Sequence, residues 1–171
     1  MRKIILNLAI SLDGFIEGPN GEYDWCFTDQ DYGMADFFKR VDTVFIGRKS
    51  WELTQSMTEP VPGMPVMKEY VFSNSLKVVK PSQTIVSGDI VSKVNEIKAS
   101  KGKDIWLFGG ASLTRTFMNA DLIDEYSLAI HPLILGSGKP LFPTIDHRLP
   151  LKLTDCKTYS TGLIIANYTR P

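Results

Sequence analysis

The sequence lacks the features that mark several large classes of protein. It has only two cysteines, Cys26 and Cys156, and two histidines, too few for a disulfide-stapled scaffold or a cysteine-rich zinc site. Nineteen basic residues balance nineteen acidic ones, so the basic footprint of a nucleic-acid or anionic-membrane binder is missing. No segment approaches the roughly 20 consecutive apolar residues of a membrane span. We therefore expect a cytoplasmic protein with reduced thiols that binds neither nucleic acid nor membranes and holds no metal.

The length and composition fit one globular domain. The chain has 171 residues, 43% of them hydrophobic and 22% charged, which is enough to bury one core without disulfides or metal. The apolar run 4–10 follows Arg2 and Lys3 as in a signal peptide, but Asn7 interrupts it and no small-residue cleavage site follows. We therefore expect residues 1–171 to form one domain that begins with a buried strand.

Short apolar runs bounded by turn residues alternate with stretches of helical spacing, which is typical of an α/β domain. Several runs are apolar at successive positions, as strands covered on both faces are. Two late runs flank Ser-Thr-Gly at 160–162 and predict a hairpin that closes the chain. The sequence thus predicts eight strands in a mostly parallel sheet with an antiparallel finish. The expected strands are residues 4–10, 43–46, 70–73, 84–87, 104–108, 125–130, 151–159 and 163–169.

Helical spacing predicts helices between these strands. Asp89 or Ser87 is placed to cap one of them, and another begins near Ser112. The predicted apolar faces are Met34, Phe37, Phe38 and Val41 in the first helix, Ile90, Val94 and Ile97 in the next, and Leu113, Phe117 and Met118 in the last.

Three stretches are predicted to be irregular. Residues 13–25 and 131–147 read as long loops, and loops of this length in a compact domain tend to carry function. Residues 58–65 contain three prolines, which exclude regular structure.

The first candidate binding motif is VFIGRKSWE, residues 44–52, in which a buried strand ends at Gly47. Arg48, Lys49 and Ser50 then open a helix, whose unpaired N–H groups and dipole favour an anion. Arginine adds a bidentate fork for phosphate, lysine a point charge and serine a hydroxyl. The alternative is that Ser50 only caps the helix and both cations are solvated.

The second motif is GGASL, residues 109–113, which also lies between a strand and a helix. At Gly109 and Gly110 the backbone can approach a phosphate or a flat ring with no Cβ in the way. The motif is neither the GxGxxG fingerprint nor a P-loop, and a tight turn with positive φ is the alternative. Two such junctions in one α/β domain support each other, because nucleotide sites lie at the carboxyl ends of parallel strands.

A third polar cluster ends another strand, at Ser73 and Asn74 in FSNS. These side chains can bond a phosphate or an adenine, although serine and asparagine also end strands as plain turn residues.

Candidate acids are few. Asp13 follows the first strand, and Asp29 and Asp31 lie beyond Trp25. A carboxylate among aromatic side chains can hold a hydrogen-bond-rich heterocycle. Aspartates near helix starts also serve as caps, so both interpretations stay open.

Four stretches together resemble the dihydrofolate reductase-like superfamily: NLAISLDGFI, VFIGRKSWE, WLFGGASL and IDEYSLAIHPLILGSGKPLF. Most closely they resemble the reductase domain at the C-terminus of the bifunctional riboflavin-biosynthesis deaminase/reductase. The similarity covers nearly the whole chain, and LGSGKPLF favours the pyrimidine-reductase branch. It implies a three-layer α/β/α fold and hydride transfer from NADPH.

The resemblance also implies roles for the motifs. Arg48 is expected to meet the 2′-phosphate of NADPH, Ser50 the pyrophosphate, and the pair at 73–74 the adenosine end. The Gly109–Gly110 pair borders the nicotinamide, and many relatives join these glycines by a cis peptide. The expected cofactor contacts are Gly47, Arg48, Lys49, Ser50, Ser73, Asn74, Gly109, Gly110, Ala111 and Ser112.

The nicotinamide is expected to face Asp13, Trp25, the Asp29/Asp31 region and residues 131–139. Dihydrofolate reductase proper has a carboxylate shortly after the tryptophan of its first long loop. Counting forward from Trp25 reaches Asp29 or Gln30, whereas counting back from Gly47 reaches Asp31, so the substrate acid stays open.

The expected substrate is an aminopyrimidine- or pterin-like heterocycle, reduced at a C=N bond or a ring-opened sugar carbon. A homodimer is also implied, because relatives are often dimers. The alternatives are dihydrofolate reductase proper and a non-catalytic nucleotide-binding module of the same fold.

Overall fold

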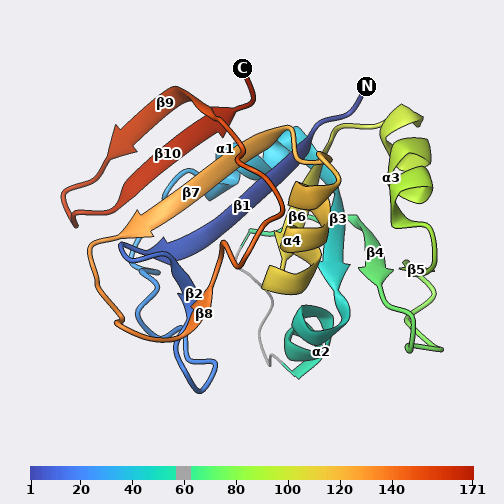
Figure 1. The fold of residues 1–171 in the computed structure, drawn as a ribbon, viewed down its shortest axis with the longest axis horizontal. Coiled ribbons are helices and arrows are strands. Elements are labelled where there is room, and N and C mark those ends of the chain that lie inside the picture. The colour runs from blue at the N-terminus through green and yellow to red at the C-terminus, as the bar shows by residue number, and fades with distance from the viewer. Residues whose placement is uncertain (57–62) are drawn as a thin grey trace.

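The structure, a computed structural model, describes residues 1–56 and 63–171. Eight of its strands form one sheet, whose order is β5-β4-β3-β6-β1-β7-β10-β9 (Figure 1). These strands are β1 (Ile4–Ser11), β3 (Val41–Gly47), β4 (Lys68–Phe72), β5 (Gln83–Val86), β6 (Asp104–Gly109), β7 (Glu125–His131), β9 (Lys152–Thr158) and β10 (Ile164–Thr169).

The sheet is parallel from β5 through β7 and antiparallel only where β10 pairs with β7 and β9. The prediction of eight mostly parallel strands with a C-terminal hairpin is confirmed. One residue was assigned to the wrong kind of element: Val41, placed on the first helix by its spacing, is the first residue of β3, because the chain turns extended directly after Arg40. The strand ends differ from the predicted ones by no more than two residues.

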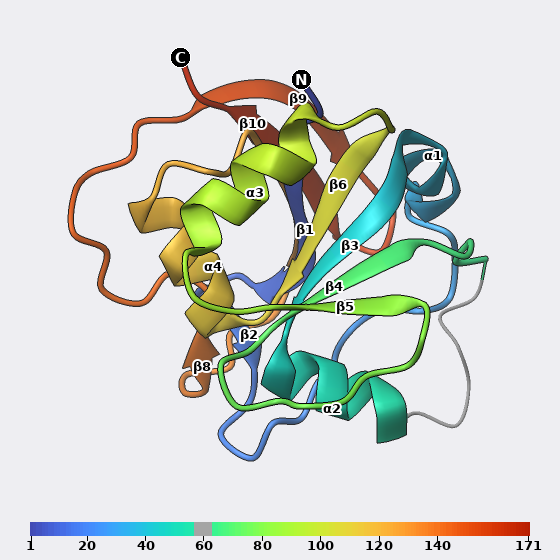
Figure 2. The same cartoon turned by 90° about the vertical axis from the view of Figure 1, so that its right-hand side faces the viewer.

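Four helices complete the fold: α1 (Met34–Arg40), α2 (Arg48–Ser56), α3 (Ile90–Ala99) and α4 (Ala111–Asn119). Helices α3 and α4 cover one face of the sheet and α1 covers the other, which gives the expected three layers (Figure 2). Asp89 caps α3 by accepting from the N–H of Ser92 at 3.1 Å, which resolves the choice between Asp89 and Ser87. None of the helices in residues 1–56 and 63–171 is long and apolar enough to cross a bilayer.

Successive residues of the central strands enter opposite cores. In β1, Ile4 and Leu6 pack beneath α3 and α4, whereas Ile5 packs with Phe37 of α1. In β3, Phe45 lies in the first core, and its neighbours lie in the second. This explains why these strands are apolar at several successive positions instead of alternating.

The two stretches predicted to be long loops contain a second, two-stranded sheet. β2 (Phe15–Glu17) pairs antiparallel with β8 (Lys139–Pro140), so the prediction of loops without strands was wrong here. The pairing continues through the N–H of Leu141, which donates to the carbonyl of Gly14 at 2.9 Å. It brings both stretches together beside the carboxyl ends of β1 and β7. Of the proline-containing stretch 58–65, residues 58–62 lie outside the described residues.

Candidate functional site

The two glycine-bearing junctions lie side by side in the structure. Ile46, next to the end of β3, is in register with Gly109 at the end of β6. A Cβ added to Gly47 would lie 3.4 Å from the carbonyl oxygen of Gly109 and 3.5 Å from the Cβ of Leu113. The sequence therefore correctly predicted that these junctions meet at one edge of the sheet.

Ser50 joins the two junctions directly. Its Oγ, in the first turn of α2, accepts a hydrogen bond of 2.9 Å from the N–H of Gly110. Ser50 therefore does not cap its own helix, which was the simpler interpretation. A Cβ on Gly110 would lie only 2.9 Å from the same Oγ, so the close approach depends on glycine. The Gly109–Gly110 peptide is cis, as the resemblance implies.

A buried hydroxyl that the sequence analysis missed lies beneath this junction. Thr114, in the first turn of α4, is fully buried, and its Oγ1 has no hydrogen-bond partner among the described residues. That atom lies 3.3 Å from where a Cβ on Gly109 would stand. A buried polar atom without a partner calls for an explanation, and a ligand group at the glycine pair is one. The signal for it was a threonine on the otherwise apolar face of α4.

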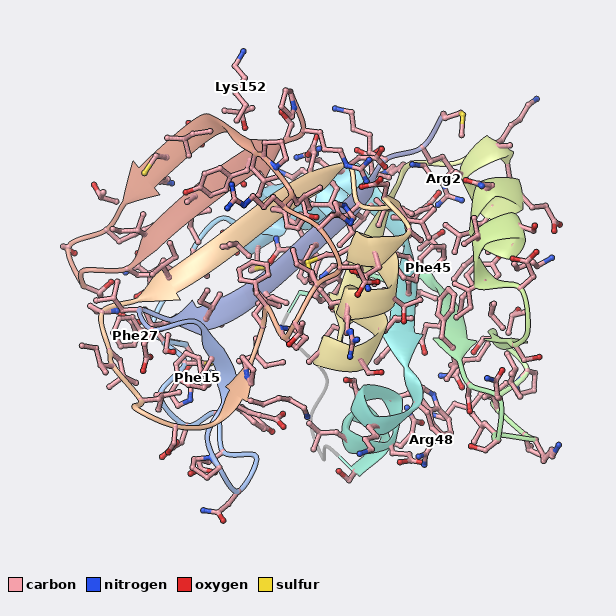
Figure 3. The ribbon with its side chains drawn as sticks, viewed as in Figure 1. Arg2, Phe15, Phe27, Phe45, Arg48 and Lys152 are labelled. Carbon is pink, nitrogen blue, oxygen red and sulfur yellow. The ribbon has the colours of Figure 1, made fainter. Side chains whose placement is uncertain are left out.

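The start of α2 is electropositive. Arg48 and Lys49 open the helix, and its first turn holds no acidic residue. Arg48 lies at the end of the molecule to which β3 runs (Figure 3). Its guanidinium pairs with Glu52 one turn later at 2.7 Å, and Lys49 is exposed. An exposed pair of this kind contributes little, so the guanidinium can exchange it for a phosphate.

Ser73 and Asn74 make local turns in the structure. The Oγ of Ser73 accepts from the N–H groups of Ser75 and Leu76, at 3.2 and 3.0 Å. The Oδ1 of Asn74 accepts from the N–H of Gly88 at 3.2 Å and so ties the end of β4 to the end of β5. The turn interpretation describes their contacts, and a contact with adenosine stays a prediction.

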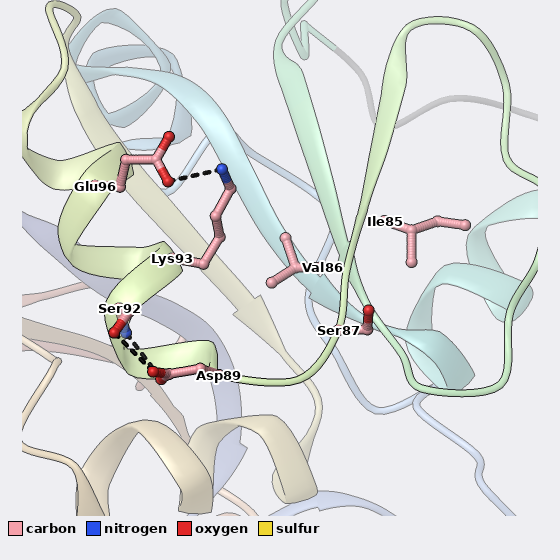
Figure 4. A pocket seen from close by; sticks show the side chains of 7 residues that line it. All are labelled: Ile85, Val86, Ser87, Asp89, Ser92, Lys93 and Glu96. Carbon is pink, nitrogen blue, oxygen red and sulfur yellow. Dashed lines mark hydrogen bonds and ion pairs between the residues drawn. The ribbon is translucent and has the colours of Figure 1, made fainter.

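A polar hollow adjoins this turn. It has a volume of about 360 Å³ and lies between the end of β5 and the first turns of α3 (Figure 4). Its charged groups already have partners, since Asp89 accepts from the hydroxyl of Ser92 and Lys93 pairs with Glu96 at 2.8 Å. Its lining residues are Ile85, Val86, Ser87, Asp89, Ser92, Lys93 and Glu96.

Asp13 anchors a loop. Its carboxylate accepts hydrogen bonds from the hydroxyl of Ser11 and from the N–H groups of Leu135 and Gly136, at 2.7, 3.1 and 2.7 Å. Desolvation raises the pKa of Asp13, but these hydrogen bonds outweigh it and hold the pKa below its usual value. Such a group is a poor proton donor, and its contacts explain how residues 131–139 are held at the end of β1.

The other two candidate acids differ in how much of the carboxylate is engaged. Both oxygens of Asp31 accept backbone hydrogen bonds at the start of α1, from Gly33 and Ala35, each at 2.9 Å. Asp29 is exposed, and one of its oxygens accepts from the hydroxyl of Tyr32 at 2.7 Å. Among the described contacts, only Asp29 keeps a carboxylate oxygen free.

Trp25 and Phe27 are held by a buried histidine. The His131 ring makes edge contacts with both, with centroids 5.2 and 5.0 Å apart. Its Nε2 accepts from the N–H of Phe27 at 3.1 Å, and its Nδ1 lies 3.0 Å from the carbonyl of Ala129. These contacts fit a neutral ring with its proton on Nδ1, and burial lowers the pKa of His131. Phe27 lies near the end of β7, on the side of the molecule away from Arg48 (Figure 3).

Most of the predicted residues thus gather along four neighbouring strand ends, and the turn at 73–74 follows a fifth, β4. In the order β3-β6-β1-β7, the first two strands carry the glycine junctions and the last two carry the carboxylate and aromatic groups. This is the edge at which ligands bind open α/β sheets. The candidate site therefore has two parts, the glycine junctions at β3 and β6 and the carboxylate and aromatic groups at β1 and β7.

Comparison with known proteins shows the family of the chain. Residues 2–165 match the family model described as the RibD C-terminal domain. The protein YyaP of Bacillus subtilis (strain 168) is 43% identical over 173 residues, covering 95% of this chain and 92% of the relative. A candidate riboflavin biosynthesis protein of Shewanella sp. PV-4 superposes with a TM-score of 0.87 at 26% identity, over 100% of this chain and 99% of the other.

A bifunctional enzyme shares the fold. The diaminohydroxyphosphoribosylaminopyrimidine deaminase/5-amino-6-(5-phosphoribosylamino)uracil reductase of Thermotoga maritima superposes with a TM-score of 0.73 at 14% identity. The match covers 99% of this chain and 57% of the larger protein. With a family model that spans nearly its whole length, the chain belongs to the RibD C-terminal domain family.

Proposed function

We propose that this protein is an NADPH-dependent reductase of an aminopyrimidine- or pterin-like heterocycle. One observation carries the proposal: the hydrogen bond from the N–H of Gly110 to the Oγ of Ser50, which holds two glycine junctions together at neighbouring strand ends. Family membership supports a reductase, and the substrate class follows the reaction named for the Thermotoga maritima protein.

The residues at these junctions fit the cofactor. The cradle at Gly110 would be filled by any side chain, and the hydroxyl of Thr114 lies unpartnered among the described residues beside Gly109. Arg48 would bind the 2′-phosphate, and Ser50 with the amides beside it the pyrophosphate. Gly109 and Gly110 would border the nicotinamide, while the turn at 73–74 would meet the adenosine. When bound, NADPH supplies a hydride equivalent.

We assign the carboxylate and aromatic groups at β1 and β7 to the substrate and call them the substrate half. There Trp25 would line the pocket and Asp29 would accept N–H groups of the heterocycle. The reaction adds one hydride to the carbon of a C=N bond and one proton to its nitrogen, so the heterocycle is reduced by two electrons and NADPH is oxidised. The proton comes from water or through a carboxylate-bound water. The chain contributes orientation and the exclusion of bulk water.

Calorimetry and a turnover assay test the proposal. We expect tighter binding of NADPH than of NADH, and loss of NADPH absorbance with 5-amino-6-(5-phosphoribosylamino)uracil or a pterin as acceptor. Turnover of dihydrofolate alone would assign the protein as dihydrofolate reductase. Binding of NADPH with no acceptor reduced would favour the non-catalytic nucleotide-binding module, which the engaged carboxylates of Asp13 and Asp31 also favour. No binding of either nucleotide would overturn the proposal.

A further inference from the structure

Tyr32 has an unusual backbone conformation for its residue type. Its φ is +49°, and among residues 1–56 and 63–171 only Asp121 is another non-glycine residue with positive φ. L-residues with bulky side chains avoid this region, so the surrounding contacts must hold it there. The residue lies directly before Gly33 and α1, in the segment that carries Trp25 and Asp29.

Aromatic contacts hold the Tyr32 ring from two sides. The ring lies 6.4 Å from that of Phe27 and 4.9 Å from that of Tyr159, which it meets edge-on. Phe27 is in turn fixed by His131 at the end of β7. The ammonium group of Lys157 lies over the Tyr159 ring, 4.9 Å from its centroid.

Tyr159 belongs to the turn of the C-terminal hairpin, far away in sequence. The turn is closed by the N–H of Tyr159 to the carbonyl of Leu163 at 3.0 Å, and by the N–H of Gly162 to the carbonyl of Tyr159 at 2.9 Å. Because Ile164 of β10 is in register with Ile130 of β7, the turn stands at the carboxyl end of β7, beside the candidate site (Figure 1). A Cβ on Gly162 would lie 3.2 Å from Pro132, which shows how closely the turn packs there.

The Tyr32 hydroxyl is the middle member of a chain of two hydrogen bonds. It donates to the Oδ1 of Asp29 at 2.7 Å, and the Oγ1 of Thr161 lies 3.2 Å from it. A phenol has one proton to donate, so the Thr161 hydroxyl donates to the phenolic oxygen. The direction therefore runs from Thr161 through Tyr32 to the carboxylate, and it fixes one oxygen of Asp29 while the other stays open.

We propose that Tyr32 is a positioning residue, held by the 159–162 turn, that sets the Asp29 carboxylate to receive the N–H groups of the heterocyclic substrate. This rests on the proposed function, since Asp29 needs a fixed orientation only if a substrate binds it. The hairpin turn is then the outer wall of the substrate half. The turn then contributes to the choice of substrate, although its sequence contains no motif that predicted a binding site.

The test compares Tyr32→Phe, Thr161→Val and Asp29→Asn with the wild type, using 5-amino-6-(5-phosphoribosylamino)uracil and NADPH. Tyr32→Phe keeps every ring contact and removes only the hydroxyl, so it is expected to fold. We expect its KM for the heterocycle to rise about tenfold, the scale of a hydrogen bond to a charged group, with kcat and NADPH affinity within about twofold. Thr161→Val should act in the same direction with a smaller effect. Tyr168→Phe, a hydroxyl removed in β10, is the matched control and should change neither constant.

The double variant Tyr32→Phe/Asp29→Asn separates positioning from a structural role. If Tyr32 acts through Asp29, adding Tyr32→Phe to Asp29→Asn changes KM no further. An equal rise of KM in both backgrounds, or an unchanged KM in Tyr32→Phe, would overturn the positioning role while the proposed function stands. A wild type that neither binds nor reduces the heterocycle would overturn both.

Discussion

The Oγ of Ser50 and the backbone N–H of Gly110 are joined by a hydrogen bond of 2.9 Å, across two junctions 60 residues apart in the chain. The side-chain oxygen of Ser50 therefore binds the glycine pair instead of an N–H group of its own helix α2. This hydrogen bond fixes the position of the glycine pair. Because the Oγ of Ser50 accepts in this bond, its hydroxyl proton remains able to be donated to a ligand.

Ser50→Ala should therefore weaken the site and the fold together. The variant leaves the N–H of Gly110 unpaired in a half-buried setting, which costs about 1 kcal/mol of unfolding free energy. We expect NADPH to bind about tenfold more weakly by calorimetry. Ser56→Ala at the exposed end of the same helix is the control, since its hydroxyl only donates to the carbonyl of Leu53. Equal binding by the two variants would remove Ser50 from the site.

Gly47→Ala tests whether a ligand approaches this backbone. The added Cβ would meet the carbonyl of Gly109 at 3.4 Å and the Cβ of Leu113 at 3.5 Å, which are ordinary contacts. Stability measured in urea should therefore stay within about 0.5 kcal/mol of the wild type. NADPH affinity should nevertheless fall, because the methyl group occupies space that the cofactor needs. Unchanged affinity would show that no ligand contacts Gly47.

The central sheet was predictable because consecutive apolar residues mark each of its parallel strands in the sequence. Runs such as Ile4, Ile5 and Leu6 of β1 are apolar at successive positions, as expected of a strand between two cores. β2 and β8 were not predictable, since strands of three and two residues, one ending in proline, show no period. Their pairing comes from the loops being brought together by the larger sheet.

The two parts of the candidate site also differ in how far the sequence predicts them. The glycine junctions at the ends of β3 and β6 were predicted, because a glycine directly after a buried strand is a local signal at both Gly47 and Gly109. Whether a nucleotide binds there stays a prediction. The substrate half depends on contacts between distant residues: Phe27 meets His131 across 104 positions, and Tyr32 meets Thr161 across 129. Neither composition nor spacing encodes such pairs. For the same reason, the sequence could not distinguish Asp13 and Asp31, which are fully engaged, from Asp29.

Arg48→Ala should remove the preference for NADPH over NADH. The guanidinium is the group able to bind a 2′-phosphate bidentately, so we expect NADPH affinity to fall about 10- to 100-fold and NADH affinity to stay the same. Glu52→Gln releases Arg48 from its exposed ion pair, and binding should change by no more than about twofold. Parallel titrations of both nucleotides decide the matter. An equal loss for both would mean that Arg48 supports the fold of α2 instead.

Asp13→Asn should loosen residues 135 and 136. The N–H groups of Leu135 and Gly136 donate to different oxygens of Asp13, so the amide of an asparagine would set a donor against one of them. Hydrogen exchange at the amides of Leu135 and Gly136 should speed up, while Asp36→Asn, an exposed change on α1, leaves it unaltered. Because the pKa of Asp13 is lowered in the fold, the same loosening should appear in the wild type as the pH falls below the usual value of 3.8. Unchanged exchange in Asp13→Asn would refute the anchoring role.

His131 should make stability depend on pH near neutrality. Burial lowers its pKa in the fold below the ordinary 6.5, so the unfolded chain binds the proton more readily. The stabilising contribution of neutral His131 to the free energy of unfolding is therefore fully present above about pH 6.5. It is lost as the pH falls from there through the pKa of the folded state. Protonation also puts a proton on Nε2, which then opposes the N–H of Phe27 and frees the loop of Trp25.

Urea unfolding at about pH 7.5 and about pH 5.5 tests this. The difference between the two free energies of unfolding should be smaller for His131→Gln than for the wild type. His147→Asn, a change at an exposed ring, should keep the wild-type difference, and a His131→Gln variant that also keeps it would show that another group is responsible.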